Sequence, residues 1–179
     1  MRDLKEDEMK LVRDKISKFI GNDFDTLLKR TDNEYSFQLH KGRVYYCSID
    51  LLKRAGVIPR SCLISFGRCI GKMTKSGKFH LNITALDLIS PYAKNKLWLK
   101  DGSDMQFLYG NNPLRSSISK ITENTPKYGG VVVYSKNDLP LGFGLSSKST
   151  LEFRSTDPLT VACYRQADIG EYLRNEEML

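Results

Sequence analysis

Seven cationic side chains and no acidic one occur in the 36 residues from Leu51 to Leu86. A stretch without carboxylates creates a local positive field, which is typical of surfaces that bind polyanions. The seven are Lys53, Arg54, Arg60, Arg68, Lys72, Lys75 and Lys78. Arg68, Lys72, Lys75 and Lys78 are the first candidates for contacts with an RNA backbone. The alternative is a solvated basic face that only keeps the protein in solution.

The charge is unevenly distributed along the chain. The net charge is +7, with 18 Lys and Arg against 11 Asp and Glu in residues 1–94, and 10 against 10 in residues 95–179. The surplus is therefore N-terminal, and cations of the second half are interleaved with acids. The RNA-binding candidates there are Arg115, Lys120, Lys148, Arg154, Arg165 and Arg174. Aromatic rings near basic residues, such as Phe79, Tyr92 and Tyr109, could stack unpaired bases, although strand aromatics more often belong to a core.

Motifs for nucleotide binding and catalysis fail on spacing. The segment 71–78 (GKMTKSGK) has the composition of a phosphate-binding loop, but Phe79 stands where such a loop needs a Ser or Thr. Gly142 and Gly144 lie among expected strands rather than at the start of a helix, with Ser147 in place of a third glycine, so they do not form a dinucleotide fingerprint. Only two histidines, His40 and His80, are present to act as bases. We expect no catalytic residues.

Metal and membrane sites are also not indicated. The cysteines 47, 62, 69 and 163 form no Cys-x-x-Cys pair, so we expect reduced thiols, no metal site and no cofactor. No apolar run approaches the roughly 20 residues of a membrane span. The N-terminus lacks the apolar segment of a secretory signal. We expect an intracellular, monomeric chain that does not bind membranes.

The elements of the first half place the basic residues on a hairpin. Helical spacing runs from Met9 to Ile20 before Gly21, and Asp3 with Glu6 could form a capping box. Alternation predicts strands at 35–40 and 43–47, joined by Lys41-Gly42. Ser48 is a suitable N-cap for a helix at 49–55.

The next two strands are expected at 63–70 and 79–84, with a turn at 74–77. Lys72, Lys75 and Lys78 then surround the tip of this hairpin, and Arg68 lies further down one strand. The basic residues would thus form one projecting surface.

Ser90-Pro91 breaks a short helix at 85–89, and here we place a domain boundary, with an N-terminal α/β domain at 1–92 and a second domain at 95–179. The pattern of the second half predicts strands at 96–100, 129–134, 141–145 and 160–164, a helix at 104–109 and a terminal helix capped by Asp168 and Glu171. The expected fold class is α+β, with an N-terminal antiparallel sheet flanked by helices.

The segment from Phe107 to Arg174 resembles a PUA domain, a small β-barrel RNA-binding module. Motifs along nearly the whole chain are similar to the Nip-seven family of large-subunit ribosome biogenesis factors. They include GRVYY (42–46), GKMTKSGKFHLNITALD (71–87), PYAKNKLW (91–98), FLYGN (107–111), ITENT (121–125), GVVVYS (130–135), DLPLGFG (138–144) and ADIGEYLR (167–174). The resemblance implies a C-terminal PUA-type β-barrel.

The resemblance also implies a function. It implies a nucleolar and nuclear, non-enzymatic protein that joins pre-60S particles, supports processing of ribosomal RNA precursors and binds U-rich single-stranded RNA and assembly proteins. The archaeal relatives have a basic tail, whereas here Arg174 is followed by the acidic NEEML. This leaves open a protein-docking adaptor with little RNA binding. A PUA-bearing RNA-modifying enzyme is the third reading, although the first half lacks a methyl-donor loop.

Overall fold

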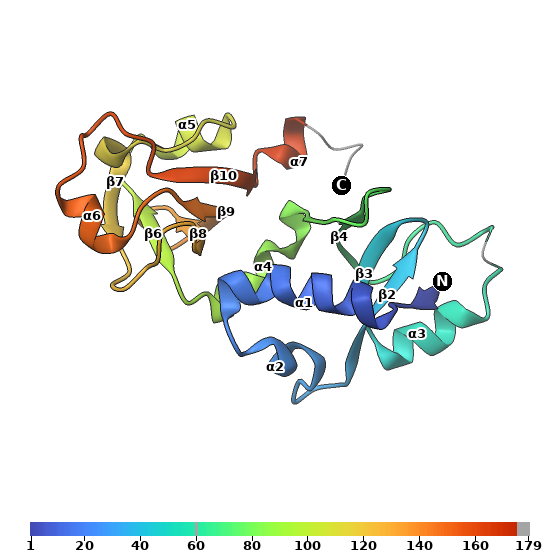
Figure 1. Cartoon of the computed structure of the whole chain (residues 1–179). Coiled ribbons are helices and arrows are strands. Elements are labelled where there is room, and N and C mark those ends of the chain that lie inside the picture. The colour runs from blue at the N-terminus through green and yellow to red at the C-terminus, as the bar shows by residue number, and fades with distance from the viewer. Residues whose placement is uncertain (60, 175–179) are drawn as a thin grey trace. The chain divides into compact units, whose positions relative to one another are not determined.

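The computed structural model describes residues 1–59 and 61–174, and the chain divides into two compact units, Met1–Leu88 and Ile89–Leu179. The division between Leu88 and Ile89 lies just before Ser90-Pro91, where the sequence analysis placed the domain boundary. Each unit contains one five-stranded sheet with short helices, so the α+β class is confirmed (Figure 1). Among the described residues, no helix is long and apolar enough to cross a membrane.

The first unit is an antiparallel sheet with strand order β1-β2-β3-β4-β5. Its elements are β1 (Arg2–Asp3), α1 (Glu6–Ile20), α2 (Phe24–Leu28), β2 (Tyr35–His40), β3 (Arg43–Ser48), α3 (Ile49–Gly56), β4 (Arg68–Met73), β5 (Phe79–Leu81), the 3₁₀ helix η1 (Ile83–Ala85) and α4 (Leu86–Ile89). The predicted β2–β3 hairpin is confirmed. Lys41 and Gly42 both have positive φ, as a two-residue hairpin turn requires.

The two faces of this sheet are covered by different helices. Phe37 on β2 pairs with Tyr46 on β3, and both point to the side of α2, where Phe37 stacks on Phe24. On the other face, Tyr45 and Cys47 form a second core with Ala55 of α3 and with Leu63 and Phe66. Burial on both faces fixes the register of the central strands, because a slip by one residue would exchange the two faces.

Helix α1 buries Val12, Ile16, Phe19 and Ile20, which is the predicted apolar stripe. The predicted cap of Asp3 with Glu6 is wrong. Asp3 belongs to β1, and the helix starts after Lys5, whose backbone N–H donates to Glu8 at 2.8 Å. The Glu8 carboxylate also accepts two hydrogen bonds from Arg2, at 2.6 and 2.7 Å, and so ties β1 to the first turn of α1.

The third predicted strand begins later than expected, at Arg68. Leu63 and Phe66 lie before it in a loop that covers Tyr45 and Cys47, and the loop reaches the strand through Gly67 with φ of +57°. The following strand is shorter than expected, since β5 ends at Leu81 and residues 83–85 form η1. The side chain of Thr84 donates to the Cys69 carbonyl there, which turns the chain away from the sheet.

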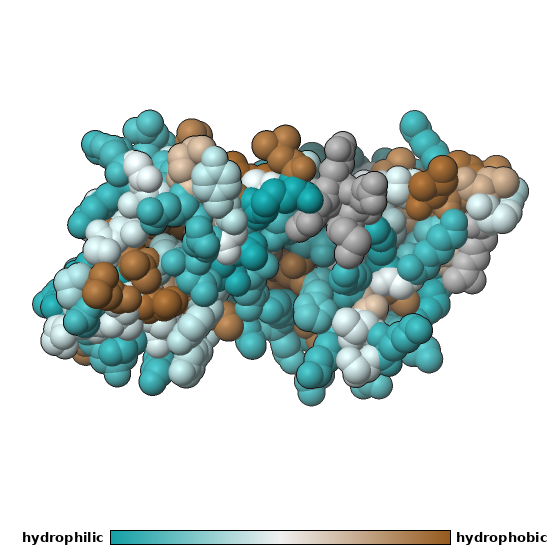
Figure 2. All heavy atoms as spheres, turned by 90° about the horizontal axis from the view of Figure 1, so that it is seen from above, coloured by the Kyte–Doolittle hydropathy of each residue, from teal (hydrophilic) through white to brown (hydrophobic). Residues whose placement is uncertain are grey.

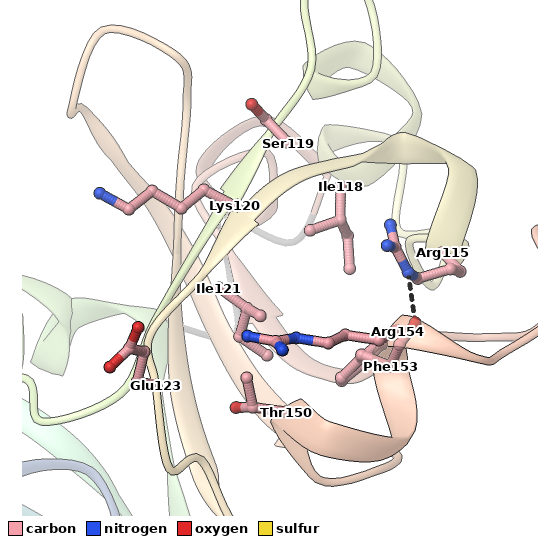
Figure 3. A pocket seen from close by; sticks show the side chains of 9 residues that line it. All are labelled: Arg115, Ile118, Ser119, Lys120, Ile121, Glu123, Thr150, Phe153 and Arg154. Carbon is pink, nitrogen blue, oxygen red and sulfur yellow. Dashed lines mark hydrogen bonds between the residues drawn. The ribbon is translucent and has the colours of Figure 1, made fainter.

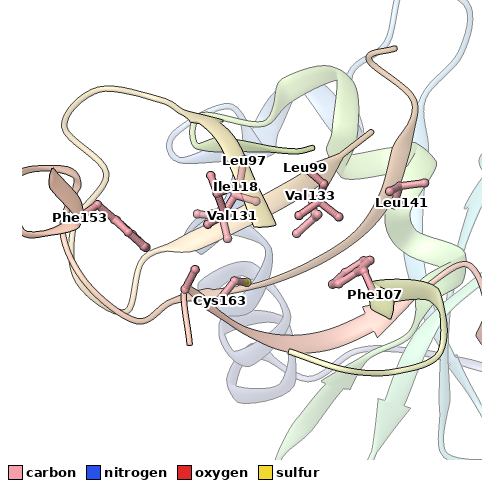
Figure 4. Close-up of a cluster of buried hydrophobic side chains, with 10 residues drawn as sticks. Leu97, Leu99, Phe107, Ile118, Val131, Val133, Leu141, Phe153 and Cys163 are labelled. Atoms are coloured by element: carbon pink, nitrogen blue, oxygen red, sulfur yellow. The ribbon is translucent and has the colours of Figure 1, made fainter. Parts of the chain in front are cut away.

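The second unit has strand order β10-β9-β8-β6-β7, with β6 and β8 parallel and the other pairs antiparallel. Its elements are the 3₁₀ helix η2 (Ser90–Tyr92), β6 (Lys96–Leu99), α5 (Asp104–Leu108), the 3₁₀ helix η3 (Arg115–Ser117), β7 (Ile118–Ile121), β8 (Gly130–Tyr134), β9 (Pro140–Ser146), α6 (Thr150–Arg154), β10 (Cys163–Asp168) and α7 (Glu171–Arg174). Figure 4 shows its core, which includes Leu97, Val131, Val133 and Phe107.

The sequence predicted a β-barrel here, and within the described residues the sheet is not closed. β7 and β10 are its edges, and the segments before them are joined by the bridge between Leu114 and Val161 and by backbone hydrogen bonds such as that from the Ala162 N–H to the Pro113 carbonyl at 2.8 Å. The last strand, β10, starts at Cys163 and not at the predicted Thr160. The Thr160 carbonyl accepts from the Arg115 N–H, so this residue pairs with the segment before β7 and not with β9. Strand β7 and helix α6 were missed by the sequence analysis.

Gly71 lies at the closest approach of β4 to β5. A Cβ added there would lie 2.2 Å from the His80 carbonyl oxygen, whereas a Cβ on Gly56 would meet nothing within 4 Å. We expect Gly71→Ala to lower the free energy of unfolding by about 1–3 kcal/mol through overpacking. Gly56→Ala should leave it within about 1 kcal/mol of wild type. Urea denaturation would check both, and equal midpoints for the two variants would contradict the close approach.

The Arg2–Glu8 pair makes a pH-dependent contribution. The hydrogen bonds that Glu8 accepts from Arg2 lower the pKa of the Glu8 carboxyl group from 4.5 to about 2. The contribution should be fully present above pH 4.5 and be lost as the pH falls toward 2, because protonated Glu8 cannot form the ion pair. The stability difference between wild type and Glu8→Gln should shrink over this window in thermal melts. In an Arg2→Met background this pH dependence should largely disappear, and its persistence would exclude Arg2 as the cause.

Candidate nucleic-acid interface

The β4–β5 hairpin presents three of the predicted cations to solvent. Its turn is held by backbone hydrogen bonds from Thr74 N to Lys78 O at 2.8 Å and from Gly77 N to Thr74 O at 3.0 Å. The Thr74 hydroxyl accepts from the Lys78 N–H at 3.0 Å. Lys72, Lys75 and Lys78 are exposed around this turn. A turn with this many hydrogen bonds holds the three ammonium groups on a defined backbone.

The register adds two further side chains to the surface. Lys72 pairs with Arg43 on β3 and with His80 on β5, so the three side chains form one row across the sheet. Directly opposed residues have Cβ atoms about 4.5–5.5 Å apart. The sequence analysis did not include Arg43 or His80 among the candidates. The turn at Lys41-Gly42 could have revealed Arg43, because it places that residue at the start of β3.

Arg68 does not belong to this group. It lies four residues before Lys72 on β4, which is about 13 Å along a strand. A register shift in the β3–β4 pairing separates the two positions, and Arg68 forms an ion pair with Asp87 at 3.3 Å. Among the described residues, no hydrogen bond or ion pair joins Lys72, Lys75 or Lys78 to an acid. We call this surface the basic hairpin. It consists of Lys72, Lys75, Lys78 and His80 of the β4–β5 hairpin, together with the neighbouring Arg43 of β3.

In the second unit, three predicted cations line one pocket, and the Lys120 side chain extends away from the two arginines (Figure 3). Arg115 comes from η3, Lys120 from β7 and Arg154 from α6, and they line a pocket of about 180 Å³ with Ser119, Thr150 and the single acid Glu123. The Nε of Arg115 donates to the Phe153 carbonyl at 2.9 Å, which fixes its guanidinium at the rim. Two arginines at one small opening, with a lysine on the adjoining strand, suit an anion such as a phosphate.

Lys120 also lies over an aromatic group on the same sheet. Its Nζ is 5.1 Å from the Trp98 ring centroid, and Trp98 stacks on Tyr134 with centroids 5.9 Å apart. The Trp98 indole donates to Asp138 at 2.6 Å. Of the aromatics proposed for base stacking, Phe79 is buried, whereas Tyr109 is exposed. Trp98 was missed because it reads as an ordinary strand residue.

Arg165 and Arg174 are engaged within the protein. Both bind the fully buried carboxylate of Asp168, at 2.7 and 2.9 Å, and Arg165 also binds Glu171 at 2.9 Å. Arg165 donates to the Gly110 carbonyl at 2.9 Å, and Arg174 donates to that of Leu108. The predicted Asp168–Glu171 cap is wrong in detail, because Asp168 accepts from the Gly170 N–H and Glu171 binds Arg165.

Lys148 precedes α6 and is only partly exposed. It lies near Glu152, whose pKa is lowered by the Ser149 backbone N–H and further by the charges of Lys127 and Lys148. The acidic residues 176 and 177 of the predicted tail lie outside the described residues.

The titratable groups of the described part of the chain include no cluster suited to a metal ion. No group of three or more His, Cys, Asp or Glu residues is placed to hold a metal ion there. Burial raises the pKa of Cys163 to about 12, so its thiol stays neutral at physiological pH. The buried His40 ring lies 2.9 Å from the Leu63 carbonyl and faces Phe66, as a packing residue does.

The second unit has the fold of PUA-domain proteins. Over 96% of this chain and 87% of the other, a PUA domain from Aeropyrum pernix superposes with a TM-score of 0.62 at 10% identity. A conserved PUA domain protein from Thermoplasma acidophilum gives a TM-score of 0.59 at 14% identity over 96% of this chain and 95% of the other. Identities this low establish the fold alone.

The family follows from closer relatives. Residues 1–83 match the NIP7/UPF0113 pre-PUA domain, and residues 95–177 match the UPF0113 PUA domain. The chain is 52% identical to the 60S ribosome subunit biogenesis protein NIP7 homolog of Tetraodon nigroviridis and 51% identical to that of Sus scrofa, over 100% of this chain and 99% of each relative. The chain therefore belongs to the NIP7/UPF0113 family.

Asp168 is the carboxylate on which the end of the second unit depends. Its removal would leave two arginines without their shared buried partner. We expect Asp168→Asn to lower the free energy of unfolding by about 3–5 kcal/mol. Asp101→Asn is the matched control, since its ion pair with Lys136 is exposed and should contribute little to stability. Denaturant unfolding would measure both, and a neutral Asp168→Asn would show that the network is dispensable.

Proposed function

We propose that this protein is a non-catalytic, RNA-binding assembly factor of the large ribosomal subunit that acts on pre-60S particles and supports processing of the ribosomal RNA precursor. The observation that carries the RNA-binding part is the basic hairpin, in which Lys72, Lys75 and Lys78 are exposed around one hydrogen-bonded turn. Family membership supports the assembly role, since the relatives are named 60S ribosome subunit biogenesis proteins.

The hairpin suits a nucleic-acid backbone better than a small anion. Its cations are spread along two strands and a turn, and a row of side chains spaced by the strand separation can meet successive phosphates. The basic pocket of Arg115, Lys120 and Arg154 is a second phosphate site within the PUA unit. Lys148, which precedes α6 and is partly exposed, is also assigned to the proposed RNA interface. Arg165 and Arg174 are assigned to the Asp168 network and Arg68 to Asp87, so they contribute less to RNA binding.

We further propose a nucleolar and nuclear location, a monomeric state and preference for single-stranded, U-rich RNA. On this proposal the protein has no catalytic role and acts by occupying surfaces on the particle. Binding through phosphates gives little sequence preference by itself, so any preference for U-rich segments would come from contacts with bases.

A protein-docking role is the second candidate, and one specific observation favours it. Met105, Leu108, Tyr109, Ile169 and Leu173 line an apolar pocket of about 400 Å³ between α5 and α7. Figure 2 shows a mostly hydrophilic face on which apolar residues gather in separate groups. An apolar pocket of this kind on an otherwise polar surface suits a side chain of an assembly protein.

The salt dependence of RNA binding tests the hairpin. The triple variant Lys72→Ala, Lys75→Ala and Lys78→Ala should weaken binding of a single-stranded RNA. It should also reduce the slope of log affinity against log salt by about 2, at about 0.7 per phosphate contact. Fluorescence anisotropy at several salt concentrations measures both quantities.

A variant with Lys10→Ala, Lys18→Ala and Lys29→Ala is the control, because it has the same net charge and changes exposed lysines outside the hairpin. Arg68→Ala should have a smaller effect than any hairpin lysine. Equal affinity and slope for the two triple variants would remove the hairpin from the interface.

A further inference from the structure

Two exposed tyrosine rings stack on each other at the surface of the PUA unit. Tyr128 and Tyr164 have centroids 6.4 Å apart and ring planes 24° apart, and they are 57% and 45% exposed. Tyr128 lies in the loop before β8, and Tyr164 lies on β10 opposite Leu145 of β9. Neither residue belongs to the core of the unit. The packing of the fold therefore does not account for the pair.

The backbone holds Tyr128 in an unusual conformation. Its φ is +59°, a region that bulky side chains rarely adopt, although Gly129 follows directly and could have taken that conformation instead. The Tyr128 N–H donates to the Ser146 carbonyl at 2.8 Å, and the Gly129 N–H donates to the Pro126 carbonyl at 3.0 Å. These bonds keep the Tyr128 ring against Tyr164. Strained residues of this kind cluster at ligand sites, where the strain pre-organises contacts.

Positive charge lies beside the stacked pair. The Lys127 Nζ is 5.3 Å from the Tyr128 ring centroid. Lys148 is close in space, because Ser146, which binds the Tyr128 N–H, donates its hydroxyl to the Lys148 carbonyl at 2.6 Å. Glu152 is the acid near both lysines. Two cations and one acid leave a net positive charge next to two exposed aromatic rings.

We propose that Tyr128 and Tyr164 form a stacking platform for an unpaired base of single-stranded RNA, with Lys127 and Lys148 binding the adjacent phosphates. Every base has an aromatic face, and a rigid ring beside a cation binds it without requiring a particular sequence. The platform rests on the proposed RNA-binding function. It adds a base contact that the basic hairpin and the basic pocket, which bind phosphates, do not supply.

The test compares a normal RNA with one that lacks bases. The probes are a fluorescein-labelled ten-nucleotide oligouridylate and a ten-unit abasic RNA of the same charge. Tyr164→Ala should weaken oligouridylate binding by roughly 5- to 150-fold, the range for loss of one stacked base. Its slope of log affinity against log salt should stay at the wild-type value, because no phosphate contact is removed. Binding of the abasic RNA should be the same for wild type and Tyr164→Ala.

Three variants separate stacking from structural effects. Tyr164→Phe keeps the ring and should bind oligouridylate as wild type does. Tyr128→Asn removes the second ring, and Asn tolerates the positive φ of this position. This variant should weaken oligouridylate binding as much as Tyr164→Ala does. Tyr172→Ala removes an exposed tyrosine of α7 that belongs to none of the proposed sites, and it should have no effect on binding.

The outcomes distinguish the platform from the function beneath it. If wild type binds oligouridylate and Tyr164→Ala binds it equally well, the platform is overturned and the RNA-binding function stands. An equal loss of affinity for the abasic RNA would also overturn the platform, because stacking needs a base. If wild type binds neither probe, the RNA-binding function itself fails, and the platform fails with it.

Discussion

The close approach of β4 and β5 at Gly71 sets the position of the whole basic hairpin. The space where a side chain would begin at residue 71 is taken by the His80 carbonyl and the Phe79 ring. This contact fixes the register, which places Lys72 opposite His80 and beside Arg43. A shift by one residue would move Lys72 to the other face of the sheet. The positive surface is thus a consequence of backbone packing between two short strands.

In the second unit, the buried carboxylate of Asp168 determines where two of the arginines lie. A fully buried carboxylate needs compensating charge, and Arg165 and Arg174 provide it. Both arginines are thereby committed to joining β10 and α7 to the end of α5. The cations that remain for a ligand gather elsewhere, around the pocket of Arg115, Lys120 and Arg154. Ion pairing within the unit therefore decides which of its arginines can meet an RNA phosphate.

Local patterns in the sequence were sufficient for several regular elements, although β7 and α6 were missed. The β2–β3 hairpin, the Ser48 cap of α3 and the apolar stripe of α1 follow from alternation, capping chemistry and helical spacing. Features that depend on distant partners were not predictable. Arg165 looks like any exposed cation until Asp168 folds beside it, and Leu63 and Phe66 look like strand residues until α3 covers them. Convergence of Arg115 and Arg154 on one pocket likewise needs the tertiary fold.

Lysine footprinting by mass spectrometry tests the central claim, that RNA binds at the basic hairpin, most directly. Purified full-length protein is acetylated at low reagent concentration with and without single-stranded RNA, and modification is quantified at each lysine. The account predicts that RNA protects Lys72, Lys75 and Lys78, while Lys10 and Lys18 on α1 react equally in both samples. Equal reactivity of the three hairpin lysines with and without saturating RNA would contradict it.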